Sequence, residues 1–471
     1  MRTRTGRGSR AVVLGAGIGG LVAARVLADT FDEVTIVERD VMPGGGRGRR
    51  GVPQGRHVHG MQSGGLQLLG DLFPDLRTQL AEDGAREVHD LSRLWLRFSG
   101  RLLSQAEVPI APVLSVTRPH LEWRMRQRVR GLPGVHIAEG LDVLGVASEI
   151  DGDRVRVTGA RVAPAASRDA EERVIDADLV VDATGRGSRT PVWLEELGHS
   201  RPEEDRTVVQ IGYASQTVRL PRAHYPQDLV IEGRAPGRRN GFAAFAGEEG
   251  RWTVSIMSYG AAEHPPTDAG ERMRLLETMA PPWLVDALHA AEPVDDVARH
   301  AHPTSIWRHY ERLRRHPAGL VAFGDAIAAF NPIYGTGMTV ALKQALALRT
   351  ALVDGPDEDL PRRFYRAAVR PLGVAWTLSN GADLAYPETI GLRTRRGMLM
   401  GRYVERFLGA AEHDPALARR FLAVVGLADP PSALLAPAAI ARVLRSPTPA
   451  EPVLPERTRI AVGETRAEHV A

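Results

Sequence analysis

The chain opens with an apolar run, a glycine-rich turn and a helical repeat of apolar positions, and this order predicts a compact βαβ unit. The first run spans Ala11 to Leu14, the helical segment spans Gly17 to Ala28, and a second strand-like run spans Val34 to Glu38. Short continuous apolar runs are typical of parallel strands that are covered on both faces. The pattern therefore predicts an α/β fold that begins with half of a Rossmann-like sheet.

Later segments extend this first lobe. Helical periodicity is present from Gly64 to Phe73 and from Arg118 to Val129, whereas Val174 to Val181 has the composition of a single strand. A further apolar strand, Gly319 to Phe323, is followed by a helix from about Gly337 to Ala351. We expect these segments to return to the sheet that the N-terminal strands begin, so the first lobe is predicted to be discontinuous.

A second lobe is predicted from segments with β-type composition. They are Val108 to Val116, Val208 to Ser215, Gly241 to Ala246 and Trp252 to Ser258. We expect them to form an inserted antiparallel sheet that binds substrate, with the proline-containing first segment at an edge.

Domain boundaries follow from this organisation. The predicted first lobe comprises residues 1–90, 117–195 and 301–352, and the predicted sheet lobe comprises residues 91–116 and 196–300. Residues 353–471 are predicted to be a helical C-terminal region, with helical apolar spacing from Tyr403 to Val425 and a proline-containing tail from Pro430. We expect the last twenty or so residues of the tail to be mobile.

Composition narrows the classes of function. The 471 residues include 60 Lys and Arg against 57 Asp and Glu, and the two signs are interleaved, so we expect no nucleic-acid partner. The absence of cysteine excludes disulfides, thiolate metal sites and thiol chemistry. His57 and His59 alone are too few for a metal site. The basic N-terminus is superficially like a secretory signal, but glycines and Arg25 break its apolar run. No stretch is apolar for long enough to span a bilayer, and a soluble cytoplasmic protein is expected.

The early turn carries the first candidate chemistry. Gly15, Gly17 and Gly20 stand in GxGxxG register, with Ile18 and Gly19 between them. The first glycine permits a tight turn, the second allows a pyrophosphate to approach the backbone, and the third allows strand and helix to pack closely. Glu38 ends the second strand, where a carboxylate accepts hydrogen bonds from a ribose diol. This combination predicts a site for an ADP moiety.

A second motif distinguishes flavin from nicotinamide. Gly324-Asp325 follows the strand at Gly319 to Phe323, and Asn331-Pro332-Ile333-Tyr334-Gly335-Thr336-Gly337-Met338 leads into the next helix. Asp325 is suited to accept a hydrogen bond from a ribityl hydroxyl, which FAD has and nicotinamide nucleotides lack. The helix N-terminus at Gly337 and Met338 would stabilise negative charge on a reduced flavin ring.

Both motifs have close counterparts in a known family. GAGIGG with Glu38, and GDAIAAFNPIYGTGMT, resemble flavin-dependent monooxygenases of the para-hydroxybenzoate hydroxylase fold. RRGVPQGRHVH at Arg49 to His59 and DLVVDATGRGSR at Asp178 to Arg189 are similar to stretches of the actinomycete flavin epoxidases that act on polyene precursors of polyether antibiotics such as lasalocid and monensin. The resemblance covers most of the chain.

The resemblance implies a set of binding residues. The side chains and turns expected to hold non-covalent FAD are Gly15, Gly17, Ile18, Gly19, Gly20, Glu38, Arg39, Arg118, Gly324, Asp325, Pro332, Gly335, Gly337 and Met338. The candidates for the substrate pocket are His57, Tyr213, Phe245 and Tyr334, and Trp252 is a further aromatic candidate. No residue is identified as catalytic, because none must act as a base.

The resemblance also implies a reaction. Reduced FAD and O2 would give a flavin C4a-hydroperoxide that epoxidises carbon–carbon double bonds of a hydrophobic, polyketide-like intermediate. NAD(P)H is expected to bind transiently, because there is one dinucleotide fingerprint. Thr184-Gly185 stands where many aromatic hydroxylases carry an Asp-Gly pair linked to FAD and NADPH binding, so the resemblance leaves the route of nicotinamide access open. A partner flavin reductase is the alternative source of electrons.

Four other functions fit the same fold. Hydroxylation of an aromatic polyketide ranks second, followed by a prenyl or alkene reductase and a non-catalytic flavin-binding partner. Flavin halogenation is disfavoured, because the Trp-x-Trp-x-Ile-Pro signature is missing and Lys343, the only lysine, lies inside the helix after the second motif.

Overall fold

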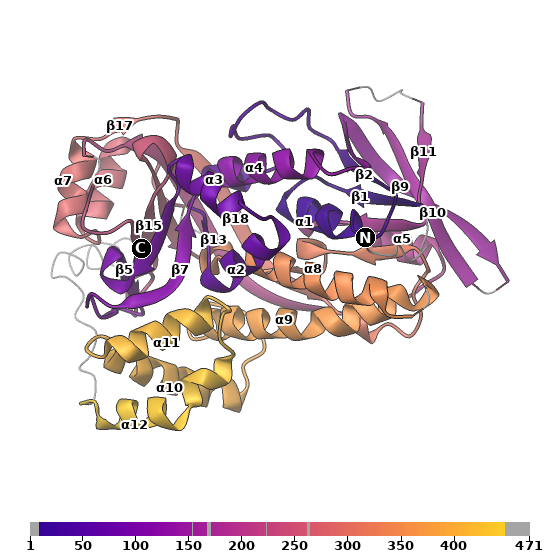
Figure 1. The fold of residues 1–471 in the computed structure, drawn as a ribbon. Helices are drawn as coiled ribbons and strands as arrows, with labels where there is room; N and C mark the ends of the chain where they lie inside the picture. Colours follow the sequence, from indigo (N-terminus) through magenta and orange to yellow (C-terminus); the bar gives the residue numbers. More distant parts are fainter. Residues whose placement is uncertain are drawn as a thin grey trace, which may run out of the picture.

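The computed structural model describes residues 9–152, 154–166, 171–222, 224–260, 264–355 and 357–447. The predicted mobile tail lies outside these residues. The first lobe is built on a five-stranded parallel sheet in the order β19-β12-β1-β2-β8 (Figure 1). Its strands are β1 (Arg10–Leu14), β2 (Glu33–Glu38), β8 (Val135–Glu139), β12 (Leu179–Asp182) and β19 (Leu320–Ala322). They come from distant parts of the chain, so the sheet is assembled discontinuously.

The two faces of the parallel sheet are covered by different layers. Helices pack on one face through a large apolar core that includes Leu21, Leu342 and Phe364. They are α1 (Ile18–Leu27), α2 (Ser63–Leu72), α3 (Leu76–Glu82), α4 (Arg118–Arg130), α8 (Gly337–Val353) and α9 (Leu360–Asp383). A three-stranded antiparallel sheet covers the other face, together with α5 (Thr190–Glu196), and it comprises β9 (Leu141–Asp151), β10 (Arg154–Pro164) and β11 (Arg173–Asp176). Coverage of both faces explains the continuous apolar composition of β1 and β12.

A nine-stranded sheet forms the second lobe. Its path is β20-β18-β13-β16-β15-β14-β5-β6, with β17 paired to β13. The bounds are β5 (Leu94–Phe98), β6 (Arg101–Leu102), β13 (Glu204–Arg219), β14 (Leu229–Glu232), β15 (Asn240–Ala246), β16 (Arg251–Tyr259), β17 (Glu292–Pro293), β18 (Ala298–Arg308) and β20 (Ala328–Ala329). The pairs are antiparallel except β14 with β5, which is parallel. Helices α6 (Ala269–Glu277) and α7 (Pro282–His289) cover one face. The predicted fold class is confirmed.

Two predicted strands differ from the structure. Val174 to Val181 is not one strand: it divides into β11, which pairs with β10, and β12, which joins the parallel sheet. Val108 to Val116 contains β7 (Pro109–Ser115), which lies outside the nine-stranded sheet, as the central strand between β3 (Gly60–Met61) and β4 (Arg86–Asp90). β3 pairs only with Leu114 and Ser115, so the prolines of β7 occupy a stretch with one free side.

The predicted C-terminal region, residues 353–471, begins with α9, which packs on the first lobe, and three further α-helices follow in its described part. They are α10 (Arg395–Ala411), α11 (Pro415–Val425) and α12 (Pro437–Arg445), drawn in yellow in Figure 1. Phe407 and Phe421 of this group pack with Leu94 and Leu96 of β5 in one apolar cluster. The group therefore extends the second lobe.

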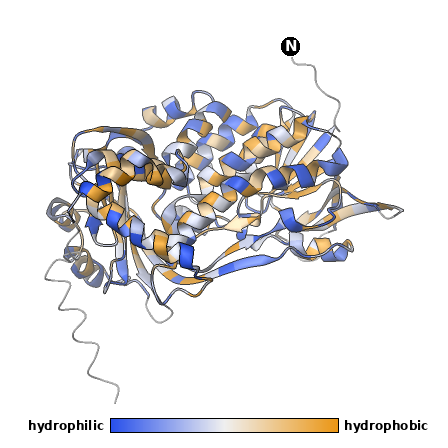
Figure 2. Ribbon diagram, turned by 90° about the horizontal axis from the view of Figure 1, so that it is seen from below, coloured by the Kyte–Doolittle hydropathy of each residue, from blue (hydrophilic) through white to orange (hydrophobic). Residues whose placement is uncertain are grey.

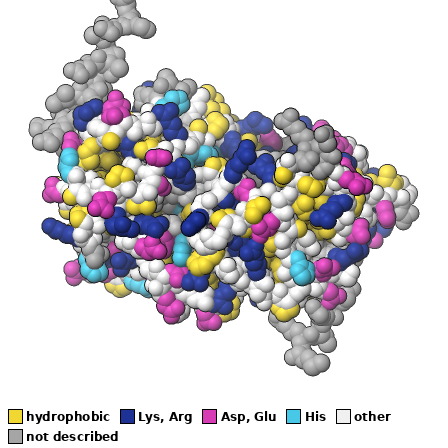
Figure 3. Space-filling model, turned by 90° about the horizontal axis from the view of Figure 1, so that it is seen from above, with side chains coloured by type: hydrophobic (Ala, Val, Ile, Leu, Met, Phe, Trp, Pro, Cys, Tyr) yellow, Lys and Arg dark blue, Asp and Glu magenta, His cyan; other side chains and the backbone are white. Residues whose placement is uncertain are grey.

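The surface and the helices have the mixed polarity of a globular protein. Figure 2 shows hydrophilic and hydrophobic positions interleaved along the helices seen from below. On the face seen from above, basic and acidic side chains are interspersed (Figure 3). Within the described ranges, no helix combines the length and apolar character needed to cross a membrane.

Candidate functional site

The glycine turn lies at the carboxyl end of β1, where open α/β sheets bind ligands. Gly15 has a φ of +94°, and its N–H donates to the carbonyl oxygen of Val37 at 2.8 Å. A Cβ on Gly20 would lie 1.9 Å from the carbonyl oxygen of Gly15, so strand and helix approach too closely there for any side chain. The predicted conformational reasons for these two glycines are thus present in the structure.

Gly17 differs from its neighbours in the turn. A Cβ at this position would meet no atom of the described chain within 4 Å, and the φ of −69° is accessible to every residue. The protein itself therefore does not require glycine at Gly17, and the open space beside it belongs to a large cavity. Glycine at this position leaves the backbone open to close approach from the cavity, as predicted for a phosphate-binding turn.

Helix α1 presents unsatisfied donors to the same space. Its N-cap is Gly17, no described side chain caps the helix, and its first turn holds no acidic residue. Free N–H groups and the positive end of the helix dipole make this terminus suited to an anionic phosphate. Gly17, Ile18 and Gly19 all line the cavity.

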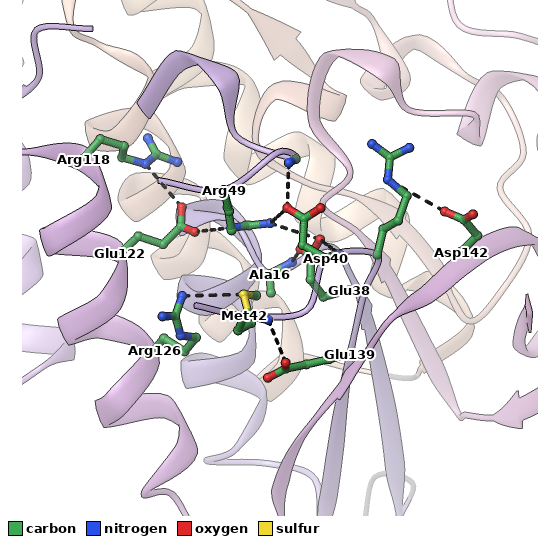
Figure 4. A network of polar contacts seen from close by, with 12 residues as sticks. Ala16, Glu38, Asp40, Met42, Arg49, Arg118, Glu122, Arg126, Glu139 and Asp142 are labelled. Atoms are coloured by element: carbon green, nitrogen blue, oxygen red, sulfur yellow. Dashed lines mark hydrogen bonds and ion pairs between the residues drawn. The ribbon is translucent and has the colours of Figure 1, made fainter. Parts of the chain in front are cut away.

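Glu38 is held at the end of β2 by a network of polar contacts (Figure 4). Its carboxylate accepts hydrogen bonds from the backbone N–H of Ala16 at 2.8 Å and of Asp40 at 3.0 Å. The guanidinium of Arg49 lies 3.0 Å from Glu38, 3.0 Å from Asp40 and 2.7 Å from Glu122. The network fixes Glu38 beside the glycine turn, at the edge of the cavity.

The charges in this network are mutually compensated. Burial by itself would lower the pKa of Arg49, but the carboxylates of Glu122 and Glu38 outweigh it and raise this pKa. Arg39, the neighbouring predicted residue, is by contrast largely exposed and lies 3.9 Å from Asp142. Arg49 is thus the structural cation of this end of the site, and the motif RRGVPQGRHVH contained it without indicating that role.

Asp325 marks the opposite end of the predicted cofactor site. Its carboxylate is 3.7 Å from the position that a Cβ on Gly337 would take, at the start of α8. This carboxyl lines the cavity but is otherwise surrounded by protein. Its burial raises its pKa, although the positive charges of Arg118 and Arg186 act to lower it. Helix α8 also begins without a described side-chain cap, so free N–H groups are available beside Asp325.

The loop between Asp325 and α8 is braced by Asp383, the last residue of α9. The side-chain amide of Asn331 donates to the carboxyl of Asp383 at 3.0 Å, and the hydroxyl of Tyr334 donates to it at 2.7 Å. The hydroxyl of Tyr213, from the second lobe, donates to Asn331 Oδ1 at 3.2 Å. Burial raises the pKa of Asp383 to about 6, against the hydrogen bonds of Tyr334 and Asn331. This carboxyl therefore ties the loop to α9, and Asn331 links the same loop to β13.

A single cavity of roughly 3130 Å³ connects these features. Of the residues predicted to bind FAD, Gly20 packs against Gly15 and the other thirteen line this cavity: Gly15, Gly17, Ile18, Gly19, Glu38, Arg39, Arg118, Gly324, Asp325, Pro332, Gly335, Gly337 and Met338. The predicted pocket residues His57, Tyr213, Phe245 and Tyr334 also line it. The structure thus places the ADP-type turn, the Asp325 loop and the apolar pocket along one continuous space.

One aromatic pocket candidate, Trp252, has a different outcome, whereas Lys343 lies inside the helix after the second motif, as predicted. Trp252 lies outside the cavity, in the core beneath α6 and α7, where its ring centroid is 5.9 Å from that of Tyr225 and 6.0 Å from that of Trp283. Alternation along β16 explains the difference, because Trp252 points to the opposite face from Ser255 and Met257, which line the cavity. Lys343 is half-buried on α8 and does not line the cavity.

Several residues that line the cavity, or that hold its lining in place, carried little sequence signal. Asp182 accepts hydrogen bonds from the hydroxyls of Thr184, Ser188 and Thr190, each at 2.6 Å, and so fixes the loop after β12. Arg186, His300 and His302 come from that loop and from β18. Within the described residues, no group of three or more His, Cys, Asp and Glu side chains forms a metal site. The DATG stretch was the only sequence signal near Asp182 and Arg186.

The sequence of the chain is similar to those of several known proteins. The chain is 36% identical over 428 residues to the Mycobacterium tuberculosis protein Rv3254, with 89% of this chain and 90% of that protein covered. It is 28% identical over 386 residues to the kynurenine 3-monooxygenase of Salinispora arenicola, with 78% and 77% covered. No protein-family model matches the chain.

A solved structure with the same architecture is the flavin-dependent brominase Bmp2. The two structures superpose with a TM-score of 0.62 at 16% sequence identity, with 93% of this chain and all (100%) of the Bmp2 chain covered. At this identity the likeness concerns the fold, and the fold is one that flavin-dependent enzymes use.

Proposed function

The chain belongs to the same family as the Mycobacterium tuberculosis protein Rv3254, and from this premise we propose that it is an FAD-dependent monooxygenase acting on a hydrophobic small molecule. One observation carries the proposal: a continuous cavity runs from Gly17, past Asp325, to the pocket beside Tyr213. An extended dinucleotide and a substrate would meet at the start of α8. The likeness to flavin-dependent enzymes supports the same assignment.

The residues present fit FAD at both ends. The open space at Gly17 and the uncapped start of α1 suit a pyrophosphate, and Glu38 suits the adenosine ribose. Asp325 would accept from the ribityl chain, and Gly337 and Met338 would offer backbone N–H groups to the flavin ring. Arg118, close enough to Asp325 to lower its pKa, would face the phosphates or the ribityl chain. No disulfide or thiol linkage is available, since the sequence lacks cysteine.

The chain's own part in the reaction is to position substrate and exclude water. When bound and reduced, FAD supplies the electrons that activate O2 for transfer of one oxygen atom. Ile231, Phe245 and Met257 line an apolar pocket on the open face of the nine-stranded sheet. A dry environment protects reactive oxygen species from loss to water. The Asn331 loop, braced by Asp383, would hold the flavin ring against this pocket.

Epoxidation of a carbon–carbon double bond is the reaction that we propose. This transfer needs no deprotonation of the substrate, whereas hydroxylation of a phenol benefits from a nearby base. Burial, with contributions from His300 and Arg56, lowers the pKa of the cavity residue His57 to about 4, so it is a poor base at neutral pH. The carboxyl of Asp383 is engaged by Tyr334 and Asn331. Oxygenation of an aromatic substrate is the second candidate, since one relative is named kynurenine 3-monooxygenase.

Isotope labelling tests the reaction directly. The FAD-loaded protein would be supplied with 18O2, with NADH or NADPH in separate reactions, and with polyene ketones or phenols. We expect an epoxide, or its diol, that carries one 18O atom. A product that gains hydrogen without oxygen would indicate a reductase, and incorporated halide would indicate a halogenase. Release of peroxide with every compound would indicate a non-catalytic flavin protein. If neither nicotinamide supports turnover, photochemically reduced FAD would test whether a partner reductase supplies the electrons.

A further inference from the structure

A chain of hydrogen bonds stands behind His57 in the pocket. The backbone N–H of Val58 donates to Ser255 Oγ at 3.0 Å, and Ser255 Oγ lies 2.6 Å from Ser215 Oγ. Ser215 Oγ lies in turn 2.6 Å from His57 Nδ1. Ser215 and Ser255 are directly opposite each other on β13 and β16, so the sheet register holds the two hydroxyls together. The imidazole is therefore anchored by rigid strands.

The direction of these hydrogen bonds determines the tautomer of His57. A backbone N–H can only donate, so Ser255 Oγ accepts from Val58. Both hydroxyl hydrogens then find acceptors only if Ser255 donates to Ser215 and Ser215 donates to His57 Nδ1. The opposite direction would leave the hydrogen of Ser255 without an acceptor among the described residues. Nδ1 thus accepts, and in a neutral imidazole the proton is then on Nε2.

The other ring nitrogen of His57, Nε2, is buried and has no hydrogen-bond partner among the described residues. His57 itself is 9% exposed and lines the cavity. The rings of His300 and Tyr213 are neighbours, with centroids at 5.4 Å and 5.7 Å. A buried donor without an acceptor is costly, so an acceptor is expected in the cavity.

We infer that His57 donates a hydrogen bond from Nε2 to an oxygen atom of the substrate, which is thus a hydrophobic molecule that bears a carbonyl, ether or hydroxyl oxygen. This inference rests on the proposed function only in that it identifies the occupant of the cavity as the substrate. His57 is a binding residue in this account, and Ser215 and Ser255 are positioning residues that act through it.

His59 is an internal reference for the tautomer of His57, because its Nδ1 donates a hydrogen bond whereas that of His57 accepts one. Its Nδ1 lies 2.8 Å from the carbonyl oxygen of His57, and a carbonyl can only accept. His59 Nδ1 must therefore carry the hydrogen, which leaves Nε2 as the acceptor in the neutral ring. Burial and the charge of Arg118 lower the pKa of His59 to about 3, so this ring is also neutral at pH 7. The two histidines should be in different tautomeric states in one protein.

Nitrogen NMR of the 15N-histidine-labelled, FAD-loaded protein tests the tautomer without turnover. We expect His57 to show protonated Nε2 and bare Nδ1 at pH 7, and His59 to show the reverse, with His57→Gln used for assignment. Ser255→Ala should release the constraint and populate the Nδ1–H form of His57. Thr253→Ala, which lies two residues away on β16 and does not line the cavity, should leave the tautomer unchanged. A wild-type His57 with hydrogen on Nδ1 would overturn the inference.

Ligand binding tests the subsite itself. The probes are geranylacetone, its longer polyene-ketone homologues and the matching hydrocarbons in which a methylene replaces the carbonyl. The FAD-loaded wild type should bind the ketones at least about 10-fold more tightly than the hydrocarbons. His57→Phe should abolish this preference, and His57→Gln, which retains an N–H donor, should keep part of it.

The outcomes separate this inference from the proposed function. Equal affinity for ketone and hydrocarbon, an unchanged preference in His57→Phe, or failure of every ketone to bind would each contradict the subsite. Ketone preference together with absence of oxygen transfer would retain the subsite and reject the monooxygenase reaction. Oxygen transfer without ketone preference would support the monooxygenase reaction and reject the subsite.

Discussion

Asp383 contributes a buried carboxyl to the loop of Asn331 and Tyr334, from a position 52 residues further along the chain than Asn331. Nothing in the local sequence of α9 distinguishes this aspartate from a helix-surface residue. Its role depends on where α9 ends relative to the loop, which is a property of the tertiary packing. The sequence therefore predicted the loop but not the side chain that braces it.

The raised pKa of Asp383 has a consequence for stability. A carboxyl whose folded-state pKa is about 6 favours its neutral form, so its contribution to stability is present below about pH 4 and is lost as pH rises through about 6. The free energy of unfolding of the wild type relative to Asp383→Asn should fall by about 3 kcal/mol between pH 4 and pH 7. Urea unfolding across this range measures the difference.

Asp414 is a control for Asp383, because its pKa is shifted in the opposite direction. Although burial acts to raise the pKa of Asp414, hydrogen bonds from Arg442 and from the backbone N–H groups of Leu417 and Ala416 lower it. Its contribution to stability is present above about pH 4 and is lost as pH falls below that value. Asp414→Asn should thus lose more stability at pH 7 than at low pH.

For Asp383→Asn, a difference in stability from the wild type that does not change with pH would contradict the raised pKa of Asp383.

Arg49 is the second residue whose importance lies in its partners. Its guanidinium is buried among Glu38, Asp40 and Glu122. Arg49→Met should lower the free energy of unfolding by about 3–5 kcal/mol, because it removes the counter-charge of the buried Glu38 and of Asp40, whereas Glu122 keeps Arg118. Arg39→Met removes only an exposed ion pair and should change it by less than about 1 kcal/mol. Urea unfolding checks both, and equal losses would disagree with the network as described.

At the scale of elements, the turn before α1 separates residues needed by the fold from a residue needed by the ligand. Gly20→Ala forces a Cβ to 1.9 Å from the Gly15 carbonyl oxygen and should destabilise the FAD-free protein strongly. Gly17→Ala meets no such contact, so the FAD-free protein should keep a melting temperature close to that of the wild type. Its affinity for FAD should nevertheless fall by at least about 10-fold, because the new methyl group obstructs the phosphates. Thermal unfolding and FAD titration give the two readouts, and normal affinity in Gly17→Ala would count against a pyrophosphate at this turn.

Elements defined by local sequence signals were predicted accurately, whereas elements defined by pairing with distant strands were not. The unit from Ala11 to Glu38 was predicted to within a residue or two, because its turn and its apolar runs are local signals. Val174 to Val181 was wrong as one strand, since the apolar pattern does not reveal that β11 and β12 join different sheets. β7 was misassigned for a similar reason, because strand composition does not specify the pairing partner.

At the scale of the whole molecule, the cavity depends on both lobes. Asn331 receives a hydrogen bond from Tyr213 of the nine-stranded sheet and donates to Asp383 of α9. Apolar patterning predicted both lobes, and residue spacing predicted the two cofactor motifs. Only the structure showed which face of β16 lines the cavity, with Ser255 in it and Trp252 outside it. The pocket was the least predictable part of the site, because its residues converge only through tertiary packing.

Ligand binding should stabilise the molecule as a unit, because the proposed cofactor contacts elements from widely separated parts of the chain. FAD at about 100 times its dissociation constant should add about 2.7 kcal/mol to the free energy of unfolding. ADP should also stabilise the protein, because the glycine turn and Glu38 provide a site for that half alone. Thermal scans at increasing ligand concentration measure both effects, and stabilisation by FMN but not by ADP would contradict the placement of the adenosine end.

We propose that the cavity from Gly17 to Tyr213 holds one FAD. The most direct test is a titration of the folded, FAD-free protein with FAD, followed by flavin absorbance and fluorescence. We expect saturation at one FAD per chain, an oxidised-flavin spectrum perturbed by the apolar environment, and weakened binding in Gly17→Ala. A folded protein that remains colourless and does not bind FAD would contradict it.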